Sequence, residues 1–136
     1  MAHTPRRIVG IVVGGSVGVA LAIAVTFLVR RLWPAYVLAE PTKAYTLPML
    51  LARLTVGACC MASAAWVATR VARDTGTAAW WLGGLVLAIS TWEHLARVWA
   101  DYPWWYHLGY LLYLVPVAVV SGRAAARRMS GHTAPR

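Results

Sequence analysis

The sequence predicts an all-α, polytopic membrane protein, in which a bundle of four transmembrane helices forms a single integral membrane domain over residues 1–136. Two observations support this prediction. Hydrophobic residues make up 60% of the chain and charged residues 12%, whereas soluble domains are about 45–50% apolar and about 25% charged. In addition, four apolar stretches approach the roughly 20 residues of helix that cross a bilayer core of about 30 Å. We therefore expect the chain to be embedded in lipid.

The first predicted helix spans residues 8–29, which contain no charge and follow Arg6 and Arg7. A secretory signal is the alternative, because the Ala-Ile-Ala motif at residues 22–24 imitates a cleavage site after a basic start. The apolar run continues past this motif and is longer than the usual signal core of about 7 to 15 residues. We expect this helix to be retained as an anchor.

Small residues recur at every fourth position of this helix and form a groove along one face. Such faces let helix backbones approach closely in lipid, where packing replaces the hydrophobic drive that associates helices in water. The partner is either the second helix, which is rich in small residues between Gly57 and Ala68, or another copy of the chain or a larger membrane complex. The packing residues are Gly10, Gly14, Gly18 and Ala22.

The second predicted helix spans residues 47–69, and its only charge is that of Arg53. Pro48 falls in the first turn, where the missing N–H costs little. Cys59 and Cys60 would point about 100° apart on a helix, so they are poorly placed to bridge each other. No other soft ligands accompany them. We therefore expect both cysteines to pack as small apolar residues, and we expect no metal site.

The third and fourth helices are predicted over residues 78–99 and 104–122. The third is free of charge as far as Thr91 and becomes polar in its last third. The fourth contains Pro116, which removes a backbone hydrogen bond and is expected to kink the helix. Residues 130–136 are polar, and we expect them to form a mobile tail.

The distribution of Lys and Arg predicts that both termini are cytoplasmic, because cytoplasmic loops carry the excess of these residues. On the outer side, Arg53 and Arg97 are borderline cases. We interpret the net charge of +9 as anchoring and attraction to anionic membrane lipid, not as nucleic-acid binding. The expected location is the cell membrane, which in a bacterium is the inner membrane. The cytoplasmic set comprises Arg6, Arg7, Arg70, Arg73, Arg123, Arg127 and Arg128.

The end of the third helix carries the main group of ionisable residues. Glu93, Arg97 and Asp101 are spaced four apart, so a continuous helix would align them on one face, with His94 beside them. Ionised side chains at this depth are costly unless they are paired or line a wet cavity, which makes them functional candidates. The simpler interpretation is that the Glu93–Arg97 pair fixes the helix register.

Residues of the second and fourth helices are expected at the same level. Arg53 would bring a second cation, and tyrosines of the fourth helix form a hydroxyl stripe. The simpler interpretations are that Arg53 extends its charge to the outer interface and that the tyrosines form an interfacial belt. The expected ligand-binding residues of this outward-facing pocket are Arg53, Arg97, Tyr106, His107, Tyr110 and Tyr113.

These residues leave several functional hypotheses open. The chain is an accessory subunit of a membrane complex, or it binds or transports a lipid or a lipophilic or anionic small molecule. Alternatively, it is an embedded isomerase or cyclase, with Glu93, His94 and Asp101 in acid/base roles on a lipophilic substrate. A haem anchor with His94 and His107 as axial ligands is the last alternative, and no other cofactor is expected. No catalytic or cofactor motif decides among them.

Overall fold

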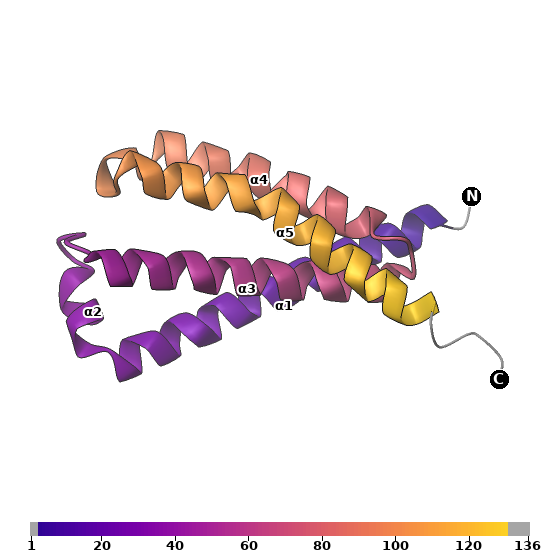
Figure 1. The fold of residues 1–136 in the computed structure, drawn as a ribbon, viewed down its shortest axis with the longest axis horizontal. Coiled ribbons are helices and arrows are strands. Elements are labelled where there is room, and N and C mark those ends of the chain that lie inside the picture. Colours follow the sequence, from indigo (N-terminus) through magenta and orange to yellow (C-terminus); the bar gives the residue numbers. More distant parts are fainter. Residues whose placement is uncertain (1–2, 131–136) are drawn as a thin grey trace.

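The computed structural model describes residues 3–130, and within this range the chain is helical and contains no strand. The all-α class predicted from the sequence is confirmed. Four long helices, one short helix and one 3₁₀ turn follow one another along the chain (Figure 1). They are α1 (His3–Leu32), α2 (Pro34–Ala39), α3 (Leu47–Ala72), α4 (Thr77–Ala96), η1 (Trp99–Asp101) and α5 (Trp104–Ser130).

Three of the long helices are long and apolar enough to cross a membrane. These are α1 from Thr4 onward, α3 and α5. The other long helix, α4, has 20 residues, carries Glu93 and His94 in its last turn, and is not among these three. The chain thus has the helices of a multi-pass membrane protein.

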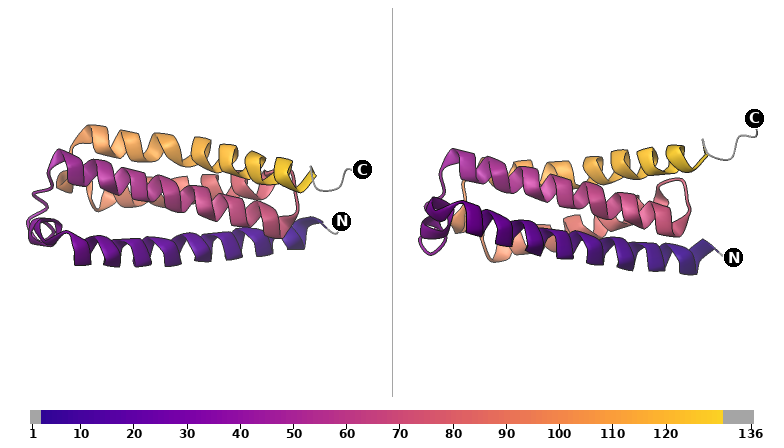
Figure 2. Two further views of the ribbon diagram at one scale, coloured as in Figure 1. Left: turned by 60° about the horizontal axis from the view of Figure 1, so that its bottom comes forward. Right: turned by 90° about the horizontal axis from the view of Figure 1, so that it is seen from below.

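The four long helices lie side by side (Figures 1 and 2). Helix α3 is central, because it contacts α1, α4 and α5, and α4 in turn contacts α5 and α1. The start of α1, the turn between α3 and α4 and the end of α5 share one end of the molecule, which we call the terminal end. The opposite end, which holds α2 and η1, is the loop end.

Glycines bring α1 and α3 into backbone contact. A Cβ atom built on Gly14 would lie 2.5 Å from the carbonyl oxygen of Ala64, and one on Gly10 would lie 2.6 Å from another carbonyl oxygen of α3. Neither position has room for a side chain. Gly18 meets the side chain of Ala64 in the same row. The glycine face expected from the sequence therefore packs within the chain, whereas Ala22, one turn further, borders a cavity.

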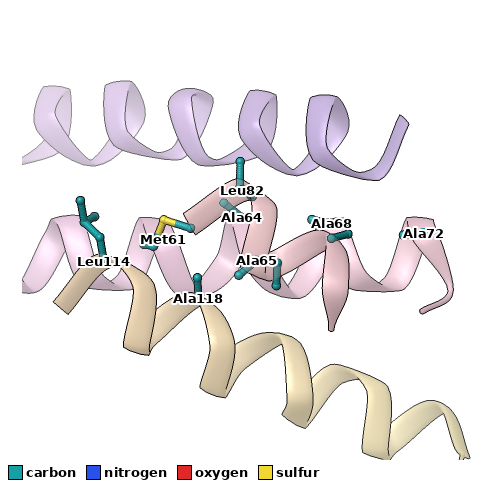
Figure 3. Packing of buried hydrophobic residues seen from close by; sticks show 10 residues of the cluster. Met61, Ala64, Ala65, Ala68, Ala72, Leu82, Leu114 and Ala118 are labelled. Carbon is teal, nitrogen blue, oxygen red and sulfur yellow. The ribbon is translucent and has the colours of Figure 1, made fainter. Parts of the chain in front are cut away.

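Alanine dominates the buried core between α3, α4 and α5 (Figure 3). Helices that meet through alanine sit close together and leave little volume between them. Leu82 of α4 and Leu114 of α5 are almost completely buried in this core. The other members of the cluster are Met61, Ala64, Ala65, Ala68, Ala72, Ala78, Ala79 and Ala118.

The turn between α3 and α4 is held by left-handed backbone conformations and by one carboxylate. Arg73 ends α3 with φ 52°, and Gly76 has φ 104°. The carboxylate of Asp74 accepts hydrogen bonds of 2.9 Å from the backbone N–H groups of Gly76 and Ala78 at the start of α4. It also lies 3.4 Å from Nε of Arg7, so that α1 is tied to the same turn.

The third helix ends earlier than the sequence predicts. Helix α4 stops before Arg97 instead of continuing to residue 99, because the N–H groups of Arg97 and Val98 both bond to the carbonyl oxygen of Glu93. This wide turn leads into η1, and Asp101 therefore lies outside the helix. The prediction of three aligned charges on one helix face is wrong beyond the Glu93–Arg97 pair.

The last helix, by contrast, is longer than predicted. Helix α5 continues to Ser130 instead of ending near residue 122, because the alanines and arginines that follow residue 122 are good helix formers even though they are not an apolar span. Ser130, the first residue of the predicted mobile tail, is the last residue of α5, and the rest of that tail lies outside the described residues. Pro116 lies inside α5, and the kink expected there stays a prediction.

Candidate functional site

A cavity of about 270 Å³ lies toward the loop end, between α1, α2, α3 and α5. We call it the loop-end cavity. Its walls combine small apolar side chains with a few polar ones, and one of these is charged. The polar lining consists of Thr26, Tyr36, Arg53, Tyr106 and Tyr110, and the apolar lining consists of Ala22, Val29, Ala52, Val56 and Gly57.

Arg53 is the charged residue of this cavity, and tyrosines from three segments hold it. Its Nη1 donates to the hydroxyl of Tyr36 at 2.5 Å and to that of Tyr45 at 3.5 Å. Its Nε donates to the hydroxyl of Tyr106 at 3.3 Å. Within residues 3–130, Nη2 donates to no protein acceptor. The half-buried guanidinium therefore retains donors for another molecule.

Tyrosine rings also surround the charge of Arg53. Its guanidinium carbon lies 5.0 Å from the ring centre of Tyr45 and 5.3 Å from that of Tyr102. These two rings stack with their centres 5.8 Å apart. Burial raises the pKa of the Tyr45 and Tyr102 hydroxyls, although the charge of Arg53 opposes this shift. Both hydroxyls are therefore neutral at physiological pH, and they stabilise the cation without neutralising it.

No carboxylate within residues 3–130 is paired with Arg53. The chain has four acidic residues, and three of them form ion pairs with arginines other than Arg53. The fourth, Asp101, forms no ion pair within residues 3–130. The charge of Arg53 thus has no counter-charge in the described part of the chain. The paired acids are Glu40, Asp74 and Glu93.

The ion pair of Glu93 and Arg97 lies away from the loop-end cavity. Nη1 of Arg97 is 3.1 Å from Oε1 of Glu93, and the Arg97 side chain is 69% exposed. Neither residue lines the cavity, and the same holds for His94 and Asp101. The structure therefore separates Arg97 from Arg53, which the sequence placed in one site. It also does not gather the three expected acid/base residues around the cavity.

His94 and His107 form a hydrogen bond with each other, and His94 stacks on Tyr106 and Tyr110. Their Nδ1 atoms are 2.8 Å apart, and His107 is completely buried. Nε2 of His107 lies 3.2 Å from the carbonyl oxygens of Trp99 and Tyr102. Because carbonyl oxygens only accept, Nε2 carries the proton, and Nδ1 of a neutral His107 accepts from His94. The pair thus connects α4 and α5 to the backbone around η1.

This contact also bears on the haem hypothesis. Metal–nitrogen bonds are about 2 Å long, so an ion shared by two imidazoles lies between them and holds the two nitrogens well apart. The Nδ1 atoms of His94 and His107 instead meet at hydrogen-bond distance. The two rings would have to separate before both bound one iron, so their present placement fits a structural pair better than a pair of axial ligands.

Tyr110 and Tyr113 continue the aromatic surface toward the middle of the molecule. Tyr110 lines the loop-end cavity and stacks on His94, with the ring centres 4.6 Å apart. The hydroxyl of Tyr113 is buried and has no hydrogen-bond partner within the described residues. It lies against Gly57, where an added Cβ atom would collide with it. Gly57 therefore leaves the space that this hydroxyl occupies.

Sequence reasoning missed three tyrosines that hold Arg53, namely Tyr36, Tyr45 and Tyr102. They belong to the links between the long helices, where no helical spacing connects them to α3 or α5. The sequence does place aromatic residues in both links at headgroup level, and that is the only local indication. Their convergence on Arg53 depends on how the links fold back over the helix ends.

Comparison with known proteins identifies no family for this chain. No family model matches it, and neither a curated protein nor a solved structure matches it. Its function must therefore be inferred from the site.

Proposed function

We propose that α4 crosses the membrane together with α1, α3 and α5, and that both termini are cytoplasmic. Helix α3 ends at the terminal end and α5 begins at the loop end, so the segment between them has to return across the same thickness. The 20 residues of α4 supply about 30 Å of helix, which equals a bilayer core. The excess of arginine near the terminal end supports a cytoplasmic position for it.

In this orientation the loop-end cavity lies in the outer half of the membrane, and we propose that it binds an anionic lipid or a lipophilic anion. One observation carries the proposal: Arg53 lines the cavity with a charge that no carboxylate of the described chain balances. A cation at membrane depth is costly unless it is paired or hydrated. An anion in the cavity would provide that pairing.

The geometry around Arg53 suits a headgroup with oxygen acceptors. Nη2 is left with its N–H groups after Nη1 and Nε have bonded to tyrosines. Charge-assisted hydrogen bonds from guanidinium to carboxylate or phosphate are among the strongest in proteins. Because tyrosine hydroxyls already fix the guanidinium, little side-chain entropy is lost on binding.

The accessory-subunit hypothesis receives less support from the packing. It relied on the glycine face of α1 and on the external loops as docking surfaces, and the glycine face is covered by α3 of the same chain. Transport of the bound molecule is a further step, and the described residues do not by themselves argue for it.

Native mass spectrometry of the purified chain in a neutral detergent tests the proposal. The probes are palmitate and phosphatidylglycerol as anions, with hexadecanol and phosphatidylcholine as neutral counterparts. We expect one tightly bound anionic amphiphile per chain and at least about tenfold weaker binding of the neutral probes, equivalent to about 1.4 kcal/mol. Arg53→Gln should remove this preference, whereas Arg53→Lys should retain part of it because the charge persists.

Arg31→Gln is the matched control. Arg31 is an exposed arginine at the loop end of α1 and does not line the cavity, so its loss removes the same charge from the same end of the molecule. Equal anion preference in the wild type and in the folded Arg53→Gln variant would reject the proposal, as would a loss of preference in Arg31→Gln of the same size.

A further inference from the structure

A second cavity of about 200 Å³ continues the first toward the middle of the molecule. Ala22, Gly57 and Tyr110 line both cavities, so the two meet at these residues. We call the second one the mid-bundle cavity. Its other lining residues are Gly15, Gly18, Val19, Cys60, Met61, Ala64, Leu82, Val86 and Leu114.

Together the two cavities form one groove that follows a single face of α3. Arg53, Gly57 and Ala64 line it at spacings close to whole helical turns. The 11 positions from Arg53 to Ala64 correspond to about 16 Å along the helix, which is about half of a bilayer core of 30 Å. The groove therefore runs from a cation at one end to an apolar pocket near the centre of the molecule.

The lining changes from polar to apolar along this path. The mid-bundle cavity contains no charged residue, and small residues on α1 and α3 leave its space open. Leu82 of α4 and Leu114 of α5 also line it. Figure 3 shows these two side chains among the buried residues of the core. A molecule that fills the whole groove must have a charged head and an apolar tail.

The size of the groove limits the tail to one chain. Cavities of about 270 and 200 Å³ together lie at the lower end of the range for small-molecule sites, about 300–1,000 Å³. Each carbon of an extended alkyl chain adds about 1.3 Å, so about 16 Å accommodates roughly 12 carbons. Because Arg53 is the one charged residue of the lining, a head with a single negative charge gives a neutral pair.

We propose that the occupant is a single-chain amphiphile with one negative charge, a long-chain carboxylate, whose chain lies in the mid-bundle cavity. This proposal rests on the proposed function, because it places the carboxylate at Arg53. It adds the number of chains, the charge of the head and the path of the tail. A two-chain phospholipid and a doubly charged monoacyl phosphate are the alternatives that the test separates.

The first test locates the tail. Dodecanoate, whose chain of 12 carbons matches the roughly 12 carbons that the groove accommodates, carries a photoreactive diazirine at its terminal carbon. It is bound to the wild-type chain in neutral detergent, irradiated, and its labels are mapped by peptide mass spectrometry. We expect labels on α1 near Gly15 and Val19 and on α3 between Cys60 and Ala64, and we expect unlabelled palmitate to suppress them. Labels confined to the outward faces of the helices, such as that of Trp80 and Trp81, would overturn the proposal.

The second test blocks the deep end of the groove. A Cβ atom on Gly15 meets only Leu82, at 3.7 Å, so Gly15→Leu fits α1 and extends into the mid-bundle cavity. We expect palmitate to bind at least about fivefold more weakly, while octanoate, whose chain ends before this level, binds as in the wild type. Retained octanoate binding also shows that the variant is folded. Gly84→Leu is the matched control, because a Cβ atom there meets nothing within 4 Å.

The outcomes separate this proposal from the proposed function. If phosphatidylglycerol or a monoacyl phosphate binds more tightly than palmitate and still depends on Arg53, the anion site stands and the single-chain, single-charge proposal fails. The same conclusion follows if Gly15→Leu and Gly84→Leu bind palmitate equally. If no anion depends on Arg53, both proposals fail.

Discussion

At the terminal end, α1 and α3 meet through glycine and alanine with backbone atoms in contact, whereas at the loop end arginine and tyrosine side chains stand between the helices. The first arrangement leaves no room for another molecule. The second borders the loop-end cavity. The contrast indicates that the two ends have different roles. The glycine contact between α1 and α3 contributes to stability, whereas the loop end has space for a ligand.

The largest expected effect comes from widening the closely packed end. Gly14→Leu would force a side chain against the carbonyl oxygen of Ala64, so α1 and α3 would have to separate. We expect a loss of about 3 kcal/mol in the free energy of unfolding, the upper end of the usual cost of overpacking, measured by denaturation in detergent micelles. Gly84→Leu serves as the control and should change little. Equal stability of the two variants would mean that the glycine contact is not essential.

A smaller effect is expected at the loop end, where removal of a charge alters binding more than folding. Arg53→Gln should weaken palmitate binding at least about tenfold. Arg97→Gln should leave it unchanged, because the Arg97 side chain is 69% exposed and is paired with Glu93. A comparable loss in both variants would restore the two-arginine site expected from the sequence. The measurement is the same titration by native mass spectrometry.

The turn at the terminal end should show an effect of about 1–2 kcal/mol. Asp74→Ala removes the acceptor for the N–H groups of Gly76 and Ala78 and the ion-pair partner of Arg7. Loss of such a capping carboxylate typically costs about 1 kcal/mol, and more when a buried charge is left behind. Thermal unfolding of the variant should show lower stability, with ligand binding at the loop end retained. An unchanged unfolding temperature would contradict the capping role.

The smallest effect concerns pH. Burial raises the pKa values of Tyr45 and Tyr102, so at pH 10 these hydroxyls keep their protons to a greater extent than an exposed tyrosine, which is about half ionised there. The unfolded chain then loses protons first, and stability should fall as the pH rises above about 10. Ultraviolet titration of the wild type against Tyr45→Phe and Tyr102→Phe measures this. A midpoint of ionisation below pH 10 for either residue would contradict the described burial.

The sequence predicts much of the fold because membrane helices follow local rules. Apolar length defines α1, α3 and α5, and the four-residue spacing of Gly10, Gly14 and Gly18 identifies the face that packs on α3. The ends are less predictable. Helix α5 continues beyond its apolar span because the residues of its last turns are good helix formers. Helix α4 ends early because two successive N–H groups bond to the carbonyl oxygen of Glu93.

The site is predictable only in part, for a physical reason. Arg53, Tyr106 and Tyr110 lie on long helices, so helical spacing places them at one level, and the structure brings them to one cavity. Tyr36 and Tyr45 lie in the link between α1 and α3, and their hydroxyls accept hydrogen bonds from Arg53. No local pattern encodes such a contact. Arg97 illustrates the opposite error: the sequence placed it at the level of Arg53, but its side chain is exposed and does not line the cavity.

The contact between α1 and α3 also has a consequence for biosynthesis. Forty residues separate the end of α1 at Leu32 from the end of α3 at Ala72, which at about 5–20 residues per second corresponds to a delay of about 2–8 s. During this interval the glycine face of α1 is already in the membrane without its partner. The close contacts of Gly10 and Gly14 with α3 therefore form only after this delay.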